Sequence, residues 1–185
     1  YKKTINMKYL MLFLLGLLTL GSCKTSTTKI KKSEEVSTTF YFTRHAEKDK
    51  DGTRDPNLST IGKQRAANLA TQLKDKNIKA IYSTDYKRTK QTAQPLADEL
   101  GLKVQIYDPN KLKALKEMLL EKHKTGSILI VGHSNTTPTL VNTFMEVDKY
   151  APLNDANEFD KIFKIEVQNN GVKTSEMMTG LTNPK

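Results

Sequence analysis

Three short polar stretches of the sequence carry residues that could bind and transfer a phosphoryl group. They are Arg44-His45, Ser83 with Arg88, and His133-Ser134-Asn135. An arginine binds phosphate oxygens through a planar fork of N–H donors, and a neutral imidazole can attack phosphorus. Each stretch alone is a weak signal, because short motifs often occur by chance. Together they indicate a site in which two histidines and two arginines hold one phosphoryl group.

The elements that must position these residues alternate between strands and helices. Strands are expected at 38–43, 78–82, 103–107 and 128–131, helices at 60–76, 86–100, 111–124 and 136–145, and a hairpin at 161–168 and 172–179. This order predicts an α/β fold, a three-layer α/β/α sandwich with a mostly parallel central sheet and a C-terminal β-hairpin at its edge. Because open α/β sheets bind ligands at the carboxyl ends of their strands, the three polar stretches are expected to meet there.

Local patterns support these elements. In the first strand Thr38, Phe40 and Phe42 alternate with Thr39, Tyr41 and Thr43, so the two sets should lie on opposite faces. The strand 128–131 is apolar throughout, as at the centre of a parallel sheet. Pro95 lies inside the helix 86–100, and a proline removes a backbone donor, so a kink or a late restart is expected there.

The first 23 residues have the pattern of a bacterial export signal. Lys8 precedes the apolar run 10–20, which is too short to cross a membrane as a stable helix. Leu20-Gly21-Ser22-Cys23 resembles a lipobox, which predicts cleavage before Cys23 and lipidation of that residue. The alternative is an ordinary signal peptide in which Cys23 has no role. The expected location is the bacterial cell envelope, with a lipid anchor in the membrane.

The rest of the chain divides into a tether and one domain. Residues 24–37 are rich in Ser, Thr, Lys and Glu and predict a flexible tether, and residues 38–185 are expected to form a single domain. The net charge of the 185 residues is +10, and without residues 1–23 the 27 basic and 20 acidic residues give +7. This balance suits an anionic small molecule or surface.

Other partners are not indicated by the composition. The lysines are spread over several elements and the chain has no Trp, so no nucleic-acid partner is expected. One Cys and three His give no pattern of metal ligands, so neither a metal nor a cofactor is expected. The domain is expected to be a monomer.

The polar stretches belong to longer motifs that occur in a characteristic order. These are Thr43-Arg44-His45-Ala46-Glu47, Leu58-Ser59-Thr60-Ile61-Gly62 with Gln64 and Ala66, Tyr82-Ser83-Thr84-Asp85, Arg88-Thr89, Gln91-Thr92-Ala93 and Val131-Gly132-His133-Ser134-Asn135. In these motifs the sequence resembles the histidine phosphatase superfamily, which has the phosphoglycerate-mutase-like fold. It is most similar to the small single-domain branch that includes phosphohistidine phosphatases.

The resemblance implies a two-step phosphoryl transfer. His45 would attack phosphorus and become a phosphohistidine, which water then hydrolyses. Arg44, Arg88 and His133 would hold the phosphoryl oxygens, and the substrate-binding set would also include Ser134 and Asn135. Charge builds on these oxygens in the transition state, so cationic donors would lower the barrier.

The sequence departs from the family pattern at two points. Ala46 stands where the family usually has Gly, and its methyl group is expected to fit. Many members carry a glutamate general acid after the third strand, and the corresponding position here is near Asp108. Asp108 is therefore the candidate acid, and Glu47, close to the nucleophile, is the rival. The alternative is that Asp108 only caps the next helix beside Pro109.

The function expected from these features is that of an exported phosphomonoesterase of the histidine acid phosphatase type. Its substrates would be small phosphate esters or phosphorylated surface glycans. The alternatives are a protein phosphohistidine phosphatase, a catalytically silent lipoprotein that binds phosphorylated ligands, and a basic domain that binds anionic envelope polymers. Arg54 could contact an anionic substrate, although a surface charge is favoured, and His123 is expected to face solvent beside Lys122 and Lys124.

Overall fold

The computed structural model describes residues 38–168 and 171–179. The expected signal segment with Cys23, the expected tether and the hairpin turn at 169–170 lie outside the described residues. The elements in chain order are β1 (Thr38–Arg44), α2 (Thr60–Leu73), β2 (Ile78–Ser83), α3 (Lys87–Leu100), β3 (Val104–Ile106), α4 (Leu112–Lys122), β4 (Gly126–Gly132), α5 (Thr136–Met145), β5 (Lys161–Gln168) and β6 (Gly171–Met178). The expected alternation of strands and helices is confirmed.

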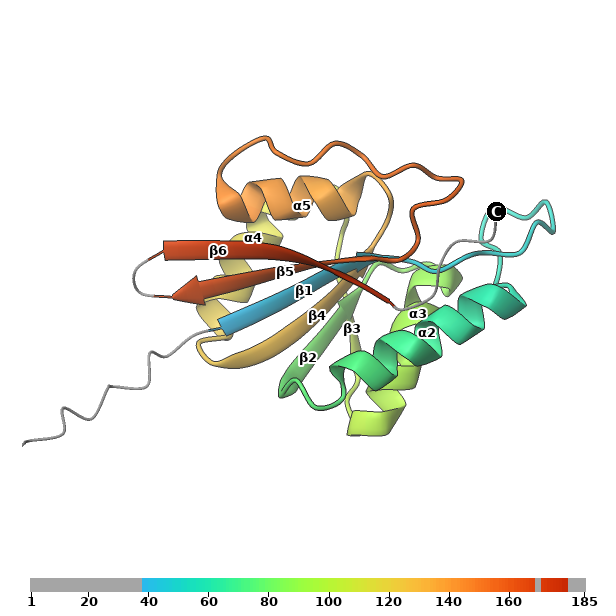
Figure 1. Cartoon of the computed structure of the whole chain (residues 1–185), viewed down its shortest axis with the longest axis horizontal. Coiled ribbons are helices and arrows are strands. Elements are labelled where there is room, and N and C mark those ends of the chain that lie inside the picture. Colours follow the sequence, from blue (N-terminus) through green and yellow to red (C-terminus); the bar gives the residue numbers. More distant parts are fainter. Residues whose placement is uncertain (1–37, 169–170, 180–185) are drawn as a thin grey trace, which may run out of the picture. The chain divides into compact units, whose positions relative to one another are not determined.

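The strands form one sheet in the order β3-β2-β4-β1-β5-β6 (Figure 1). The four strands β3, β2, β4 and β1 are parallel to one another. Strand β5 is antiparallel to β1, and β6 is antiparallel to β5. The mostly parallel sheet and the terminal hairpin at its edge are therefore confirmed.

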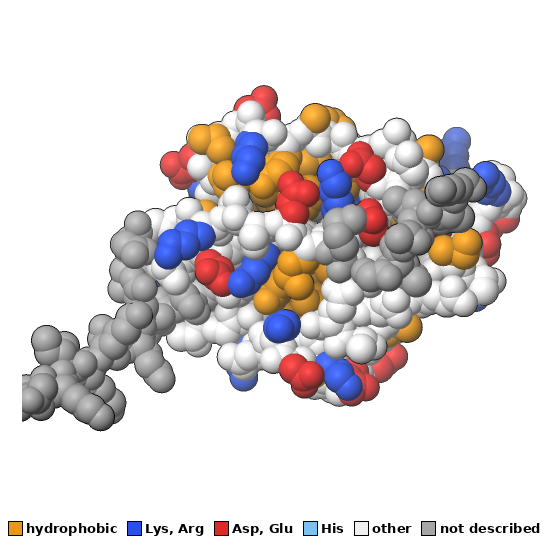
Figure 2. Space-filling view, in the orientation of Figure 1, with side chains coloured by type: hydrophobic (Ala, Val, Ile, Leu, Met, Phe, Trp, Pro, Cys, Tyr) orange, Lys and Arg blue, Asp and Glu red, His pale blue; other side chains and the backbone are white. Residues whose placement is uncertain are grey.

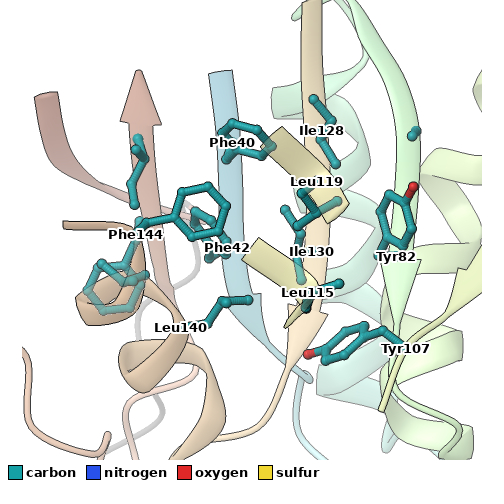
Figure 3. Close-up of a cluster of buried hydrophobic side chains, with 14 of the residues drawn as sticks. Phe40, Phe42, Tyr82, Tyr107, Leu115, Leu119, Ile128, Ile130, Leu140 and Phe144 are labelled. Carbon is teal, nitrogen blue, oxygen red and sulfur yellow. The ribbon is translucent and has the colours of Figure 1, made fainter. Parts of the chain in front are cut away.

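Helices α4 and α5 cover one face of the sheet. Phe40 and Phe42 of β1 are fully buried on this face, and both rings contact the ring of Phe144 in α5. Figure 3 shows this cluster, with Ile128 and Ile130 of β4 beside Leu115 and Leu119 of α4. The period of two in the first strand places these aromatic rings on a single face.

Helices α2 and α3 cover the opposite face. Tyr41 of β1 packs in a cluster with Leu69 and Leu73 of α2, Leu96 of α3 and Leu129 of β4. Because both faces of the central strands are covered, β4 is apolar on both sides. The expected three-layer arrangement is confirmed.

Two details of the helices differ from the sequence expectation. Helix α2 ends at Leu73 instead of Lys76, and α4 is shorter at both ends than expected. Helix α3 runs through Pro95 without interruption, so the expected late restart is wrong. Ala93 and Leu96 on either side of Pro95 are fully buried, and this burial offsets the hydrogen bond that the proline removes.

The register of the parallel strands decides where the polar stretches lie. Arg44 at the end of β1 is opposite Gly132 at the end of β4, and Ser83 at the end of β2 is opposite Val131. The backbone N–H of His45 still donates to the carbonyl of Gly132 at 2.9 Å. The motifs that follow these three strands therefore start at the same level of the sheet.

The surface seen in Figure 2 mixes charges of both signs. Lysine and arginine side chains lie among acidic ones over this face of the molecule. This face therefore has no continuous basic patch of the kind that would bind an anionic polymer. None of the described helices has both the length and the apolar content that crossing a membrane requires.

Candidate active site

A cavity of about 650 Å³ lies at the carboxyl ends of the central strands. The predicted residues that line it are Arg44, His45, Arg88, His133, Ser134 and Asn135. The structure thus brings together the two histidines and two arginines that the sequence placed after different strands. Ser83 is buried next to them, but its hydroxyl donates to the carbonyl of Thr84 and it does not line the cavity.

His45 is held in the form that can act as a nucleophile. Its Nδ1 lies 2.7 Å from the carbonyl oxygen of Ala46, which can only accept, so Nδ1 carries the proton. In the neutral ring the lone pair is then on Nε2. Burial, together with the charges of Arg44, Arg88 and His133, lowers the pKa of His45 to about 3, although the bond to Ala46 opposes the shift. His45 is therefore neutral at ordinary pH.

His133 is fixed by a chain of hydroxyl groups. Thr84 Oγ1 donates to Thr89 Oγ1 at 3.0 Å, so it accepts from Nε2–H of His133 at 2.9 Å. Nδ1 of His133 is then the unprotonated nitrogen, and it lies 3.5 Å from Nη2 of Arg88. Burial, followed by the charges of Arg88 and Arg44, lowers the pKa of His133 to about 4. This role of Thr84 was not predicted from the sequence.

The two arginines present unused donors. Within the described residues, Nε of Arg44 and Nε of Arg88 are buried without a hydrogen-bond partner, and Nη1 of Arg88 makes no hydrogen bond but lies 3.6 Å from Oδ1 of Asp55. A buried donor without a partner costs about 1–3 kcal/mol, so these groups favour an anionic ligand. Each guanidinium is stacked on a ring, Arg44 at 4.0 Å from Phe159 and Arg88 at 4.4 Å from Tyr86. Stacking fixes the planes of both groups without using their N–H donors.

The turn after β4 forms another side of the cavity. Asn135 is the N-cap residue of α5 and uses no side-chain bond for capping. Ser134 holds the carboxylate of Asp155 by a side-chain hydrogen bond. The positive end of the α5 dipole lies here, because Thr136 begins the helix and also lines the cavity.

Asp108, the candidate general acid, is not brought to this cluster. Its Oδ1 accepts from the backbone and side-chain nitrogens of Asn110, at 2.9 and 3.0 Å, and Lys111 lies 3.8 Å away. This turn after β3 directs the carboxylate away from the cavity, which Pro109 and Asn110 line instead. The alternative, that Asp108 caps the next helix, is also wrong, because Lys111 is the N-cap residue of α4 and no side chain caps it; Asp108 instead stabilises the turn before α4.

Glu47, the rival acid, has a different partner. Its carboxylate makes a two-pronged ion pair with Arg65 of α2, whose side chain is only 2% exposed. Arg65 also donates to Thr179 after β6, at 2.9 Å. Glu47 does not line the cavity. This pair instead ties the nucleophile motif to α2 and to the end of the hairpin.

Asp155 is the carboxylate that does line the cavity among the described residues, and the sequence did not indicate it. It lies in the long loop between α5 and β5, and its Oδ1 accepts from Nη2 of Arg44 at 2.9 Å. The hydrogen bond from Ser134, followed by the charge of Arg44, keeps the pKa of Asp155 below its usual value. No local motif marks this residue, because its partners are distant in sequence.

Two residues of lesser interest are also placed by the structure. Arg54 is exposed and does not line the cavity, as expected for a surface charge. His123 does not simply face solvent, since it is half-buried and its Nε2 lies 3.0 Å from the hydroxyl of Tyr82. That expectation is corrected, because His123, the C-cap residue of α4, packs against Tyr82 of β2. The described residues hold no group of three or more His, Cys, Asp or Glu side chains that could bind a metal ion.

Comparison with known proteins agrees with the motifs. A sequence model described as the histidine phosphatase superfamily, branch 1, matches residues 40–118, from β1 into α4. The chain belongs to the histidine phosphatase superfamily. Over 94 residues this histidine phosphatase is 34% identical to proteins from Escherichia coli named probable phosphoglycerate mutase GpmB. That match covers 48% of the chain and 43% of the length of the relative, so the chain spans less than half of these curated relatives.

Solved structures share the fold over more of the chain. A phosphoserine phosphatase mutant from Entamoeba histolytica is 16% identical with a TM-score of 0.62, covering 77% of this chain and 98% of that one. The protein histidine phosphatase SixA is 18% identical with a TM-score of 0.59, covering 76% and 97%. At these identities the likeness concerns the fold alone. The proteins that match are thus named as phosphatases and as probable phosphoglycerate mutases.

Proposed function

We propose that this histidine phosphatase hydrolyses phosphomonoesters through a phosphohistidine intermediate on His45. The proposal rests on how His45 and the two arginines are arranged in the cavity. A neutral His45 with a free Nε2 lies in the same cavity as the unpartnered guanidinium donors of Arg44 and Arg88. A nucleophile and the donors for an anion thus line one cavity, as electrostatic catalysis requires.

In the first step Nε2 of His45 attacks phosphorus. The P–Nε2 bond forms while the bond from phosphorus to the leaving oxygen breaks, and the electron pair leaves with that oxygen. The charge on the phosphoryl oxygens is held by the N–H groups of Arg44 and Arg88. Each such donor contributes roughly 10²- to 10³-fold to the rate in comparable sites. The proton remains on Nδ1, which continues to donate a hydrogen bond to the carbonyl of Ala46.

In the second step a water oxygen attacks the phosphohistidine. The P–O bond forms, the P–Nε2 bond breaks, and the electron pair returns to Nε2, so that His45 regains its neutral form. The proton of the water passes to solvent or to the released phosphate. The cavity opens to solvent at exposed residues such as Lys48 and Asn110, which gives water a path to the intermediate.

Neither of the predicted acids is placed to protonate the leaving oxygen. Asp108 and Glu47 are directed elsewhere, and Asp155 is ionised at neutral pH because its pKa is lowered. Esters whose leaving group is stable as an anion should therefore react fastest, which makes p-nitrophenyl phosphate the suitable first substrate.

The physiological substrates proposed are small phosphate esters or phosphorylated surface glycans. This choice follows from the export signal and lipobox expected in residues 1–23, which would attach the protein to the bacterial cell envelope through Cys23. The cavity suits such ligands, because its volume is within the range of small-molecule sites and its deep end is cationic. Protein phosphohistidine is the second candidate, since SixA shares the fold.

The rival from another class is a lipoprotein that only binds phosphorylated ligands. A binding protein would need the guanidinium donors, but it would have no use for an imidazole held with Nε2 free. The two possibilities differ in one measurable property, a covalent phosphoenzyme.

The test is rapid acid-free quenching in SDS at alkaline pH after mixing the purified 24–185 chain with ³²P-labelled acetyl phosphate. Phosphohistidine survives alkali and is lost in acid, whereas phosphoserine behaves in the opposite way. The wild type should form an alkali-stable label and turn over p-nitrophenyl phosphate. His45→Ala should do neither. His123→Ala is the matched control, because this histidine lies outside the cavity, and it should be labelled like the wild type.

Absence of label and turnover in the wild type, with retained binding of inorganic phosphate, would establish the binding protein instead. Label that persists in His45→Ala would assign the nucleophile to another residue.

A further inference from the structure

One wall of the cavity is made by a segment that carries no family motif. This segment, Leu153–Phe159, lies in the loop between α5 and β5, and we call it the strap. Leu153, Asp155 and Phe159 all line the cavity. The strap crosses from the α5 side to β5, which is the strand next to β1 and therefore next to Arg44.

The strap holds Arg44 on three sides. Nη1 of Arg44 donates to the backbone carbonyls of Asn154 at 3.0 Å and Glu158 at 3.4 Å. Nη2 donates to the carboxylate of Asp155 at 2.9 Å. The ring of Phe159 lies 4.0 Å from the centre of the guanidinium. Both terminal nitrogens are therefore used by the strap, while Nε has no partner among the described residues.

The strap is itself fixed at several points. The backbone N–H of Leu153 donates to the carbonyl of Ser134 at 2.8 Å, and the Leu153 side chain is buried in the core. Within the strap the N–H of Asn154 donates to the Glu158 carboxylate at 2.6 Å, and the N–H of Glu158 donates to the Asn154 carbonyl at 3.1 Å. A segment closed on itself in this way can impose an orientation on Arg44.

Asp155 is the charged member that joins the strap to both catalytic motifs. It accepts from Arg44 after β1 and from Ser134 after β4. Its side chain is 80% exposed, whereas that of Arg44 is 2% exposed. The ion pair therefore joins a solvent-exposed carboxylate to a buried guanidinium. Without Asp155, Nη2 of Arg44 would lose its acceptor in the strap, and the guanidinium would be held only through Nη1 and the ring of Phe159.

We propose that the strap is a positioning element of the phosphoryl site, and that Asp155 is the residue through which it aims Nε of Arg44 at the phosphoryl group. The inference rests on the proposed function, since it assigns Arg44 to the phosphoryl oxygens. Asp155 acts through Arg44 and does not touch the reacting atoms. Loss of Asp155 should therefore weaken binding of the transition state more than binding of the ground state, because the transition state requires the more exact geometry.

The experiment compares Asp155→Ala and Asp155→Asn with the wild type in two kinds of binding and in catalysis. Vanadate, which forms a five-coordinate adduct with a nucleophile, reports on the transition state, and inorganic phosphate reports on the ground state. Asp155→Ala should lower kcat and weaken vanadate binding by roughly 10- to 100-fold, because misplacing a catalytic group by about 1 Å has effects of this size. The affinity for inorganic phosphate should change by less than about threefold.

The Asn variant separates orientation from charge. Asp155→Asn keeps the shape and one acceptor oxygen for Nη2 of Arg44, so its loss should be smaller than that of the Ala variant. Asp148→Asn is the matched control, because it removes a carboxylate from the same loop whose partner is Asn142. It should leave kcat and vanadate binding unchanged. Thermal unfolding of every variant checks that the fold is retained.

A double-mutant cycle assigns the effect to Arg44. A lysine has no pair of terminal nitrogens for the strap to hold, so in an Arg44→Lys background Asp155→Ala should weaken vanadate binding by less than about twofold. An equal loss in both backgrounds would show that Asp155 acts elsewhere and would overturn the proposal. Unchanged vanadate affinity in Asp155→Ala would do the same.

A third result would reverse the interpretation. If Asp155→Ala binds phosphate much more tightly and kcat does not fall, the carboxylate competes with phosphate for Arg44 instead of positioning it. Failure of the proposed function is distinguishable from all of these outcomes. In that case the wild type forms no phosphoenzyme and does not turn over p-nitrophenyl phosphate, whereas failure of the strap proposal alone leaves both properties of the wild type intact and makes Asp155→Ala equal to the wild type.

Discussion

Replacing Gly62 by Ala tests how rigidly α2 is docked on the nucleophile motif. A Cβ at this position would lie 2.0 Å from the carbonyl oxygen of Glu47, where ordinary contacts begin at 3.4 Å. The oxygen cannot simply move aside, because it accepts from the backbone and the hydroxyl of Ser59, at 2.9 and 3.3 Å. Glu47 follows His45 by two residues, so a shift here also reaches the carbonyl that orients the imidazole.

The size of the effect follows from two opposing contributions. Ala is favoured over Gly inside a helix by about 0.5–1 kcal/mol. Overpacking a rigid contact costs about 1–3 kcal/mol. The added Cβ and the carbonyl oxygen would be about 1.4 Å closer than an ordinary contact, and both are anchored to the backbone, so the cost lies at the upper end. The expected net loss is about 2 kcal/mol, which lowers Tm by roughly 4–8 °C in a domain of this size.

The assay is thermal unfolding of wild type and Gly62→Ala by circular dichroism, together with turnover of p-nitrophenyl phosphate. Activity should fall more than stability explains, because Ala46 and His45 move with Glu47. Lys63→Ala is the matched control, since this exposed residue lies on the same turn of α2 and its side chain points to solvent. A Gly62→Ala protein that is more stable than wild type and fully active would refute the reasoning, because only the helix-propensity gain would then remain.

Three further outcomes are expected. Glu47→Ala removes the carboxylate that neutralises the buried Arg65 and should lower the free energy of unfolding by about 3–5 kcal/mol in denaturant titrations. His45 and His133 stay neutral in the folded protein at pH 5, because their pKa values are about 3 and 4, whereas the unfolded chain protonates both below about 6.5. The unfolded state then binds more protons, so stability falls from pH 7 to pH 5, and His45→Ala should flatten this slope by up to about 1.4 kcal/mol per pH unit. Asp108→Asn should keep kcat within about twofold of wild type, as for a surface substitution, and a larger loss would restore Asp108 as the acid.

The two arginines of the cavity help to decide between a phosphoryl site and a surface that binds anionic polymers. Arg44 and Arg88 each keep a buried N–H group unpaired and each is stacked on a ring, which a surface for anionic polymers would not require. The mixed charges in Figure 2 also argue against such a surface on that face. The cavity therefore remains the feature that any substrate must fit.

The sequence by itself determined the order of the elements and most of the polar residues that meet in the cavity. The alternation of Phe40, Tyr41 and Phe42 specifies a strand with two covered faces, and the fold has them. Asn169-Asn170-Gly171 between two alternating stretches specifies a hairpin, and β5 pairs with β6. These signals are local, since a period or a turn residue is legible within a few positions of the chain.

Only the tertiary structure decided which carboxylates face the cavity. Asp108 and Glu47 are close in sequence to family motifs, but one accepts from Asn110 and the other from the buried Arg65. Asp155 lies 111 positions from Arg44 and carries no motif, but it reaches the cavity. The physical reason is that a side chain's partner is fixed by the strand order and by the path of a loop across the sheet. Residue spacing along the chain contains neither.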